Sequence, residues 1–173
     1  MYKLKDWIEE NKIDWTRLSI KIKSIYFIEN NMDKINWGLI SRDPDAISIL
    51  EQYRDKIDWD ELSFNPNAIH LLKKNLNKIN WDILSWNPCA INILENNLDK
   101  INWNRLSQNP NAISILKKNL NKINWEYLSS NQGAISILEQ NYDKINWNVL
   151  SMNTNAVHLL EQNQDNRFFA IIH

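Results

Sequence analysis

Hydrophobic residues recur along the chain with a fixed period of 22 residues, which the tryptophans mark most clearly. Seven of the nine tryptophans are spaced by 22 residues: Trp15, Trp37, Trp59, Trp81, Trp103, Trp125 and Trp147. We number each repeat from its tryptophan, which is position 1, and we number the repeats 1 to 7 along the chain. A fixed period of this length predicts tandem repeats, each of which buries its apolar face against its neighbours.

The pattern within one repeat predicts two short helices joined by a turn. Position 22 is Asn or Asp, a favoured N-cap residue, and the tryptophan that follows it is expected to begin helix A. Helix A is expected to end near the serine that occupies position 5 of every repeat. Asn at position 7 and Pro at position 8 predict the start of helix B, of about ten residues, with apolar positions at helical spacing. Asn at position 17 tolerates a left-handed conformation and is expected to end helix B.

These elements predict an all-α protein, an α-solenoid of seven 22-residue helix-turn-helix repeats with divergent terminal caps. The repeats occupy residues 15–165, and residues 1–14 form an N-terminal partial repeat or cap. The repeated tryptophan is expected to lie in the core, because a ligand-stacking residue would not be needed in every repeat.

Residues 166–173 depart from the repeat and form an apolar C-terminal cap or tail. The tail is expected to cover the last repeat or to join two chains into a homodimer. Its apolar residues are Phe168, Phe169, Ile171 and Ile172.

The repeats, of the form Asp-Lys-Ile-Asn-Trp-x-x-Leu-Ser-x-Asn-Pro-x-Ala-Ile-x-Ile-Leu-Glu-x-Asn, resemble a short helical repeat found in proteins of giant DNA viruses. The resemblance covers residues 7–165 and concerns the type of repeat. It implies a viral protein that acts in an infected host cell or in the virus particle. It transfers no catalytic or binding residue onto this chain.

Charge and hydropathy limit the binding partners and the cellular location that we expect. The formal net charge of −1 gives no bulk field that would favour nucleic acid or an anionic membrane. No run of 18 apolar residues exists, so we expect no membrane span. The first residues are charged where a signal peptide needs an apolar core, so we expect a soluble intracellular protein that is not secreted, in the host cytoplasm or the virion.

The residues that usually carry catalysis or bind metals are few and scattered. His70 and His158 both occupy position 12 but lie four repeats apart, and the single cysteine, Cys89, has no histidine near it in the sequence. The two glycines cannot form a phosphate-binding loop. We therefore expect no enzyme activity, no metal site and no cofactor.

Charged residues recur at two positions of the repeat, 20 and 15. Lysine at position 20 recurs in six repeats and could follow a phosphate backbone, but Asp or Asn flanks each lysine, so we expect a solvated edge rather than a nucleic-acid site. Position 15 alternates in sign, which predicts a ladder of ion pairs between repeats. Its members are Glu51, Lys73, Glu95, Lys117 and Glu139.

Position 6 is the most varied column and offers a candidate surface for a protein partner. Arg42, Phe64 and Trp86 lie in this column, on the connection between the helices, where exposure is expected. Position 3 can share the same ridge and adds Glu61, Arg105 and Tyr127. The composition is that of a binding hot spot, which predicts a non-catalytic scaffold for protein–protein interaction. Two alternatives stay open: Phe64 and Trp86 pack over their own loops, or the chain is a self-associating virion component.

Overall fold

The computed structural model describes residues 12–21 and 25–163, and these residues form helices and turns with no strand. The predicted all-α repeat fold is confirmed. The chain divides into two compact blocks, the N-terminal block of residues 1–80 and the C-terminal block of residues 81–173. Each block is described by itself.

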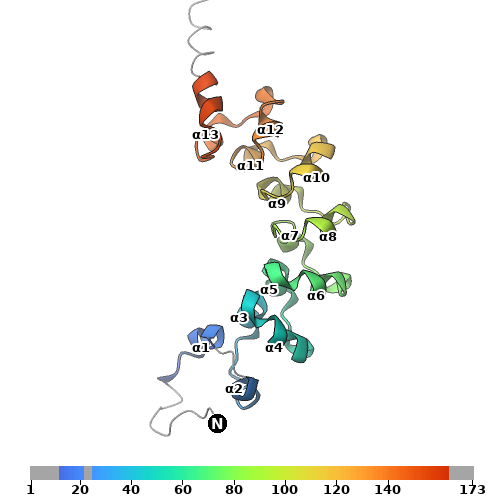
Figure 1. Ribbon diagram of the computed structural model, residues 1–173, viewed down its shortest axis with the longest axis vertical. Helices are drawn as coiled ribbons and strands as arrows, with labels where there is room; N and C mark the ends of the chain where they lie inside the picture. Colours follow the sequence, from blue (N-terminus) through green and yellow to red (C-terminus); the bar gives the residue numbers. More distant parts are fainter. Residues whose placement is uncertain (1–11, 22–24, 164–173) are drawn as a thin grey trace, which may run out of the picture. The chain divides into compact units, whose positions relative to one another are not determined.

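The N-terminal block alternates the two kinds of helix, with 3₁₀ turns between them (Figure 1). Helices of type A pack against one another in sequence, α1 against α3 and α3 against α5. The α-helices are α1 (Trp15–Lys21), α2 (Ile25–Glu29), α3 (Trp37–Arg42), α4 (Ile47–Gln52), α5 (Trp59–Phe64) and α6 (Ile69–Lys73). The 3₁₀ turns are Pro44–Ala46, Arg54–Lys56, Pro66–Ala68 and Leu76–Lys78.

The C-terminal block repeats the same alternation, and in Figure 1 its odd-numbered helices form one row and its even-numbered helices a second. Within the first row α9 packs against α11, and α11 packs against α13. The α-helices are α7 (Trp81–Leu84), α8 (Ile91–Glu95), α9 (Trp103–Gln108), α10 (Ile113–Lys118), α11 (Trp125–Ser129), α12 (Ile135–Leu138) and α13 (Trp147–Leu150). Residues 157–163 are also helical, and 3₁₀ turns lie at Leu120–Lys122 and Tyr142–Lys144.

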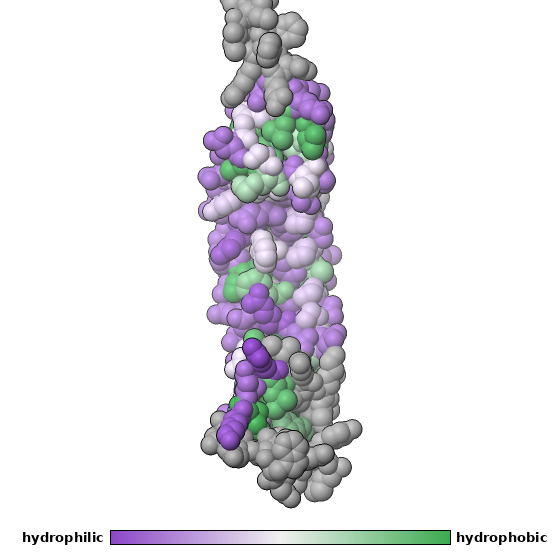
Figure 2. Space-filling model, turned by 90° about the vertical axis from the view of Figure 1, so that its left-hand side faces the viewer, coloured by the Kyte–Doolittle hydropathy of each residue, from purple (hydrophilic) through white to green (hydrophobic). Residues whose placement is uncertain are grey.

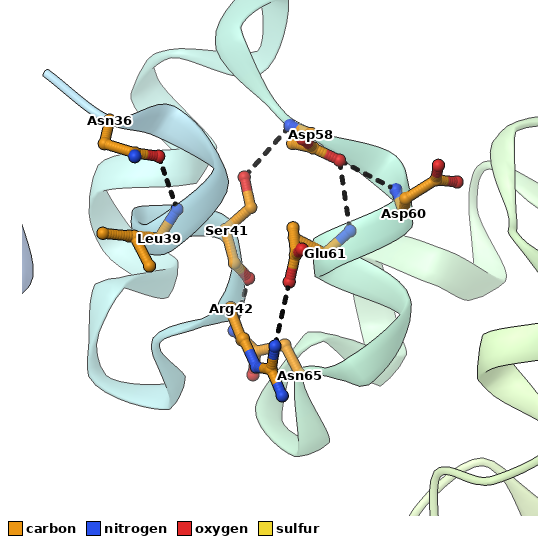
Figure 3. Close-up of polar contacts among 8 residues, drawn as sticks. All are labelled: Asn36, Leu39, Ser41, Arg42, Asp58, Asp60, Glu61 and Asn65. Atoms are coloured by element: carbon orange, nitrogen blue, oxygen red, sulfur yellow. Dashed lines mark hydrogen bonds and ion pairs between the residues drawn. The ribbon is translucent and has the colours of Figure 1, made fainter. Parts of the chain in front are cut away.

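Helix A begins where the sequence predicts. The side chain of Asn36 accepts a hydrogen bond from the backbone N–H of Leu39, and Asp58 accepts from the N–H groups of Asp60 and Glu61 (Figure 3). The tryptophan that follows each cap is the first helical residue. A side chain that satisfies the exposed N–H groups of the first turn stabilises so short a helix at its weakest point.

Helix B is shorter than predicted. Positions 8–10 form a 3₁₀ turn or a simple turn, and the α-helix begins only at position 11 and lasts between four and six residues in repeats 2 to 6. The asparagine at position 7 caps that turn, as in Asn65, whose Oδ1 accepts from the N–H of Asn67 at 3.0 Å. This bond reaches two residues ahead, which tightens the backbone and delays the α-helix.

Helix B ends near position 17 by a different mechanism from the left-handed asparagine that the sequence predicts. No described residue has a positive φ angle, and Asn75 at position 17 has a φ of −136°. Its Nδ2 instead donates to the carbonyl oxygen of Leu71 at 2.9 Å. Asn97, Asn119 and Asn141 make the equivalent bond. The asparagine therefore caps the helix with its side chain, by satisfying a carbonyl group of the last turn.

The core consists of aliphatic side chains at equivalent positions of the repeats. The prediction that the repeat tryptophan lies in the core is wrong. Leu62 at position 4, Ala68 at position 10 and Leu72 at position 14 are buried, as are their equivalents in repeats 2 to 6. All seven repeat tryptophans are only half-buried. Small and aliphatic side chains fill the space between adjacent helices, and the first residue of helix A lies at the edge of that space.

Buried asparagines at position 7 connect repeats 3, 5, 6 and 7 to the repeats that precede them. In Asn109 the Nδ2 donates to the carbonyl oxygens of Ser85 and Asn87, at 3.2 and 3.1 Å, while Oδ1 accepts from the N–H of Asn111 at 3.0 Å. Asn65, Asn131 and Asn153 make the same three bonds. The sequence predicts the capping bond but not the two bonds to the preceding repeat.

The serine at position 5 makes a second connection. Ser107 is buried, donates from Oγ to the carbonyl oxygen of Trp103 at 2.7 Å, and accepts from the N–H of Asn124 at 3.0 Å. Ser19, Ser63, Ser85 and Ser129 repeat both bonds. One hydroxyl group thus ties the end of helix A to the cap of the next helix A.

Candidate binding surface

Three of the predicted surface residues come together in the N-terminal block. The guanidinium carbon of Arg42, the last residue of α3, lies 4.6 Å from the centre of the Phe64 ring in α5. Its Nη1 is 3.5 Å from a carboxylate oxygen of Glu61, also in α5 (Figure 3). Arg42 is exposed, while Glu61 and Phe64 are half-buried. Because α3 packs against α5, position 6 of one repeat meets positions 3 and 6 of the next.

The other three predicted residues lie on separate repeats of the C-terminal block. Trp86 follows α7 in a turn, and its residue surface is 46% exposed. Arg105 in α9 has its Nε 3.6 Å from a carboxylate oxygen of Asp82 in α7. Tyr127 in α11 is 40% exposed. All three are surface residues. Arg105 contacts a carboxylate of the preceding repeat, whereas Arg42 contacts a carboxylate of the following repeat.

The predicted C-terminal contact residues, Phe168, Phe169, Ile171 and Ile172, lie outside the described residues.

The lysine column at position 20 has a structural role that the sequence did not indicate. The ammonium group of Lys122 lies 4.8 Å from the centre of the Trp103 ring, within a single repeat. Lys34 over Trp15, Lys78 over Trp59 and Lys144 over Trp125 have the same arrangement. In repeat 2 the tryptophan, Trp37, packs instead against Tyr53 at 5.4 Å. The lysines therefore cover the half-buried indole rings by cation–π contact.

The predicted ladder of ion pairs along position 15 is wrong. Glu51 contacts His70 and Glu139 contacts His158, each with a carboxylate oxygen 3.0 Å from Nε2. Between them, the Oγ of Ser114 donates to Glu95 at 3.2 Å. In each case position 15 meets position 12 of the following repeat, which is 19 residues away rather than 22. The alternating lysines of position 15 therefore do not face these glutamates.

An exposed apolar column at position 18 was missed. Leu76, Leu98 and Leu120 are exposed on the turn that follows helix B. The signal that could have shown this is the presence of Arg54 and Tyr142 in the same column, since a core position would not accept arginine.

The described surface is mainly hydrophilic on the face shown in Figure 2, where hydrophobic groups form separate patches. Among residues 12–21 and 25–163, no three side chains of His, Cys, Asp or Glu are grouped so that they could hold a metal ion. No helix in the same part of the chain is long and apolar enough to cross a membrane.

Comparison with known proteins places the repeats in a family. No curated protein and no solved structure matches the chain. The model of the family described as "Periplasmic copper-binding protein (NosD)" matches residues 7–170, which include all seven repeats. The chain therefore belongs to the NosD family.

Proposed function

We propose that the protein is a non-catalytic repeat scaffold that binds a protein partner through the variable residues of positions 3 and 6. The observation that carries the proposal is the exposure of Trp86, which is 46% exposed. Aliphatic side chains fill the core, and asparagine and serine connect the repeats, so the repeat does not require a tryptophan at this position. In repeats 5 to 7 the equivalent residues are Gln108, Ser130 and Met152.

The other residues of positions 3 and 6 have the composition and order that favour tight contact. Arginine, tryptophan and tyrosine dominate the binding energy of protein interfaces. Arg42 is already held by Glu61 and the Phe64 ring, so less side-chain entropy is lost when a partner binds it. Arg105 is placed in the same way by Asp82.

Capture of partners by a double variant tests the surface. Phe64→Ser with Trp86→Ser should abolish the specific capture that the wild-type chain shows, with little change in melting temperature. The matched control is Leu76→Ser with Leu120→Ser, which removes exposed apolar side chains from a different column and should leave capture intact. Capture that persists in the first variant would place the binding surface elsewhere.

Copper binding, which the family's description names, is not part of this proposal. A copper site uses several nitrogen and sulfur ligands brought to one point. Among the described residues each histidine at position 12 meets one glutamate, and Cys89 is exposed in a repeat without histidine. The donor set therefore does not fit copper.

The cellular setting is a separate part of the proposal. The resemblance of the repeats to those of giant DNA viruses supports a viral protein that acts on host or viral proteins inside an infected cell. The name of the family points instead to the periplasm. Fractionation of the cells that produce the protein decides between the two, because a periplasmic protein is released by osmotic shock and an intracellular one is retained.

Self-association is a second candidate function, favoured by the exposed apolar residues of repeat 7. Val157 is 55% exposed, whereas the isoleucines at its position in repeats 2 to 6 are half-buried. Met152 is 68% exposed. A second copy that covered these residues would bury them as a following repeat does. Light scattering at increasing concentration tests this: a dimer supports it, and a monomer at all concentrations contradicts it.

A further inference from the structure

A pocket in the N-terminal block combines an apolar floor with a cationic rim. Its volume is about 250 Å³, and it lies where the 3₁₀ turn of repeat 2 meets α5 and α6 of repeat 3. The floor is made by the buried or half-buried Ile57, Trp59 and Leu71, the rim by the exposed Arg54, Lys74 and Lys78, and Asn75 completes the lining.

The three positive charges of the rim are not neutralised by the pocket itself, since no carboxylate is among its lining residues in the described part of the chain. The two acidic residues nearest to Arg54 in the sequence contact other groups: Glu51 contacts His70 at 3.0 Å, and Asp55 contacts Lys56 at 3.5 Å. An anion that entered the pocket would therefore meet three positive charges and no carboxylate among the lining residues.

Arg54 departs from the repeat. It occupies position 18, where the other described repeats have apolar or aromatic residues, namely Met32, Leu76, Leu98, Leu120 and Tyr142. Its Nε donates to the carbonyl oxygen of Glu51 at 3.2 Å, which holds the guanidinium while the two terminal nitrogens keep their donors. The ammonium of Lys78 is held 4.8 Å from the centre of the Trp59 ring. Two of the three cations are thus positioned before any ligand arrives.

We propose that this pocket binds an anionic side chain, a carboxylate or a phosphate, on an acidic segment of a protein partner. Guanidinium and ammonium groups recognise both anions by charge-assisted hydrogen bonds. The volume is below the roughly 300 to 1,000 Å³ of pockets for drug-sized ligands, which suits one side chain better than a nucleotide. This proposal rests on the proposed function in one respect: it assumes that the anion belongs to a protein partner.

Peptide titration followed by NMR tests the pocket directly. The probes are a short acetylated peptide with central glutamates, the same peptide with phosphoserine, and a matched peptide with glutamine, each added to the ¹⁵N-labelled full chain. We expect a saturable shift of the Trp59 indole N–H signal with one or both acidic peptides and none with the glutamine peptide. The comparison of glutamate with phosphoserine identifies the anion. An equal response to the glutamine peptide would overturn the proposal.

Two substitutions exploit the equivalent positions of repeats 4 and 5, where Leu98 of repeat 4 corresponds to Arg54, and Trp103, Lys118 and Lys122 of repeat 5 correspond to Trp59, Lys74 and Lys78. Arg54→Leu restores the residue common in the repeat and should weaken peptide binding about tenfold, the effect of a lost charge-assisted contact. Leu98→Arg should create a second site, seen as a new saturable shift of the Trp103 indole signal. Lys74→Gln, with a residue found at this position in repeats 2, 6 and 7, provides a second loss of charge.

Unchanged affinity in both Arg54→Leu and Lys74→Gln would overturn the proposal, as would equal shifts of the Trp59 and Trp103 signals in the wild type. These outcomes leave the wider proposed function untouched, because it is tested by partner capture with the Phe64 and Trp86 variant. Conversely, loss of capture in that variant with intact peptide binding would separate the pocket from the main contact surface.

Discussion

Positions 6 and 7 are neighbours in every repeat, yet the structure uses them in opposite ways. Asn109 and Asn131 at position 7 are buried and make three hydrogen bonds each with the backbone of their own and the preceding repeat. Trp86 and Met152 at position 6 are exposed. The backbone of the preceding repeat dictates the asparagine at position 7. Position 6, in contrast, accepts arginine, phenylalanine, tryptophan, glutamine, serine and methionine. The repeat thus separates a constant scaffold from a variable surface within two adjacent residues.

Removing a buried asparagine should have the largest effect. Asn109→Ala leaves the carbonyl groups of Ser85 and Asn87 and the N–H of Asn111 without their partner. At about 1 to 3 kcal/mol for each buried unsatisfied group, we expect a loss of about 3 to 5 kcal/mol in the free energy of unfolding, measured by urea denaturation.

The matched control for Asn109 is Asn111→Ala, two residues further along. Asn111 is exposed, and its Nδ2 makes a single bond, to the carbonyl oxygen of Pro88 at 3.0 Å. Cys89 and Gly133 occupy the same position in other repeats. The control should cost about 1 kcal/mol or less. Equal losses for the two variants would show that the asparagine ladder does not hold the repeats together.

Truncation of a repeat tryptophan should have the next largest effect. Trp103 is half-buried and Leu106 is fully buried in the same helix. We expect Trp103→Ala to cost about 2 kcal/mol, below the usual 3 to 5 for a buried aromatic residue, and Leu106→Ala to cost about 3 to 4. Thermal unfolding of the two variants measures the difference, and the reverse order would restore the tryptophan to the core.

The elements that sequence predicts well are those governed by local chemistry. The N-cap at Asn36 and the start of α3 at Trp37 depend on residues a few positions apart, so the sequence places them correctly. The end of helix B at Asn75 is also local, but two mechanisms were available to asparagine, and the choice between a left-handed turn and a side-chain bond depends on the backbone that follows.

Many contacts between repeats could not be read from the period. A period of 22 suggests that equivalent positions face one another, yet Glu51 meets His70, which is 19 residues away, and Asn65 meets Ser41, which is 24 away. The offset of 19 joins position 15 of one repeat to position 12 of the following repeat. The same offset brings Arg42 to Glu61 and thereby assembles half of the candidate surface. The exposure of Trp86 was predicted correctly. The prediction rested on the sequence alone, because the next repeat has no equivalent aromatic residue at position 6.

Loss of the serine connection should have a moderate effect. Ser107→Ala removes the hydroxyl that bonds the carbonyl of Trp103 and the N–H of Asn124. We expect a cost of about 1 to 2 kcal/mol in chemical denaturation. Ser114→Ala is the control, because Ser114 is exposed and bonds only to the side chain of Glu95. A control that costs as much as Ser107→Ala would remove the distinction between buried and exposed serines.

The smallest expected effect concerns the lysines that cover the tryptophans. Lys122→Gln removes the cation from the Trp103 ring and should cost about 0.5 kcal/mol, the usual size of an exposed cation–π contact. Lys117→Gln is the control, since it removes the same charge from an exposed position of α10 in the same repeat. Both variants lose one positive charge, so a shared effect of net charge cancels between them. In the double variant with Trp103→Ala, the cost of Lys122→Gln should vanish, whereas the cost of Lys117→Gln should not change. If the lysine costs as much without the indole as with it, then its contribution is one of general charge, and position 20 returns to the solvated edge that the sequence alone predicts.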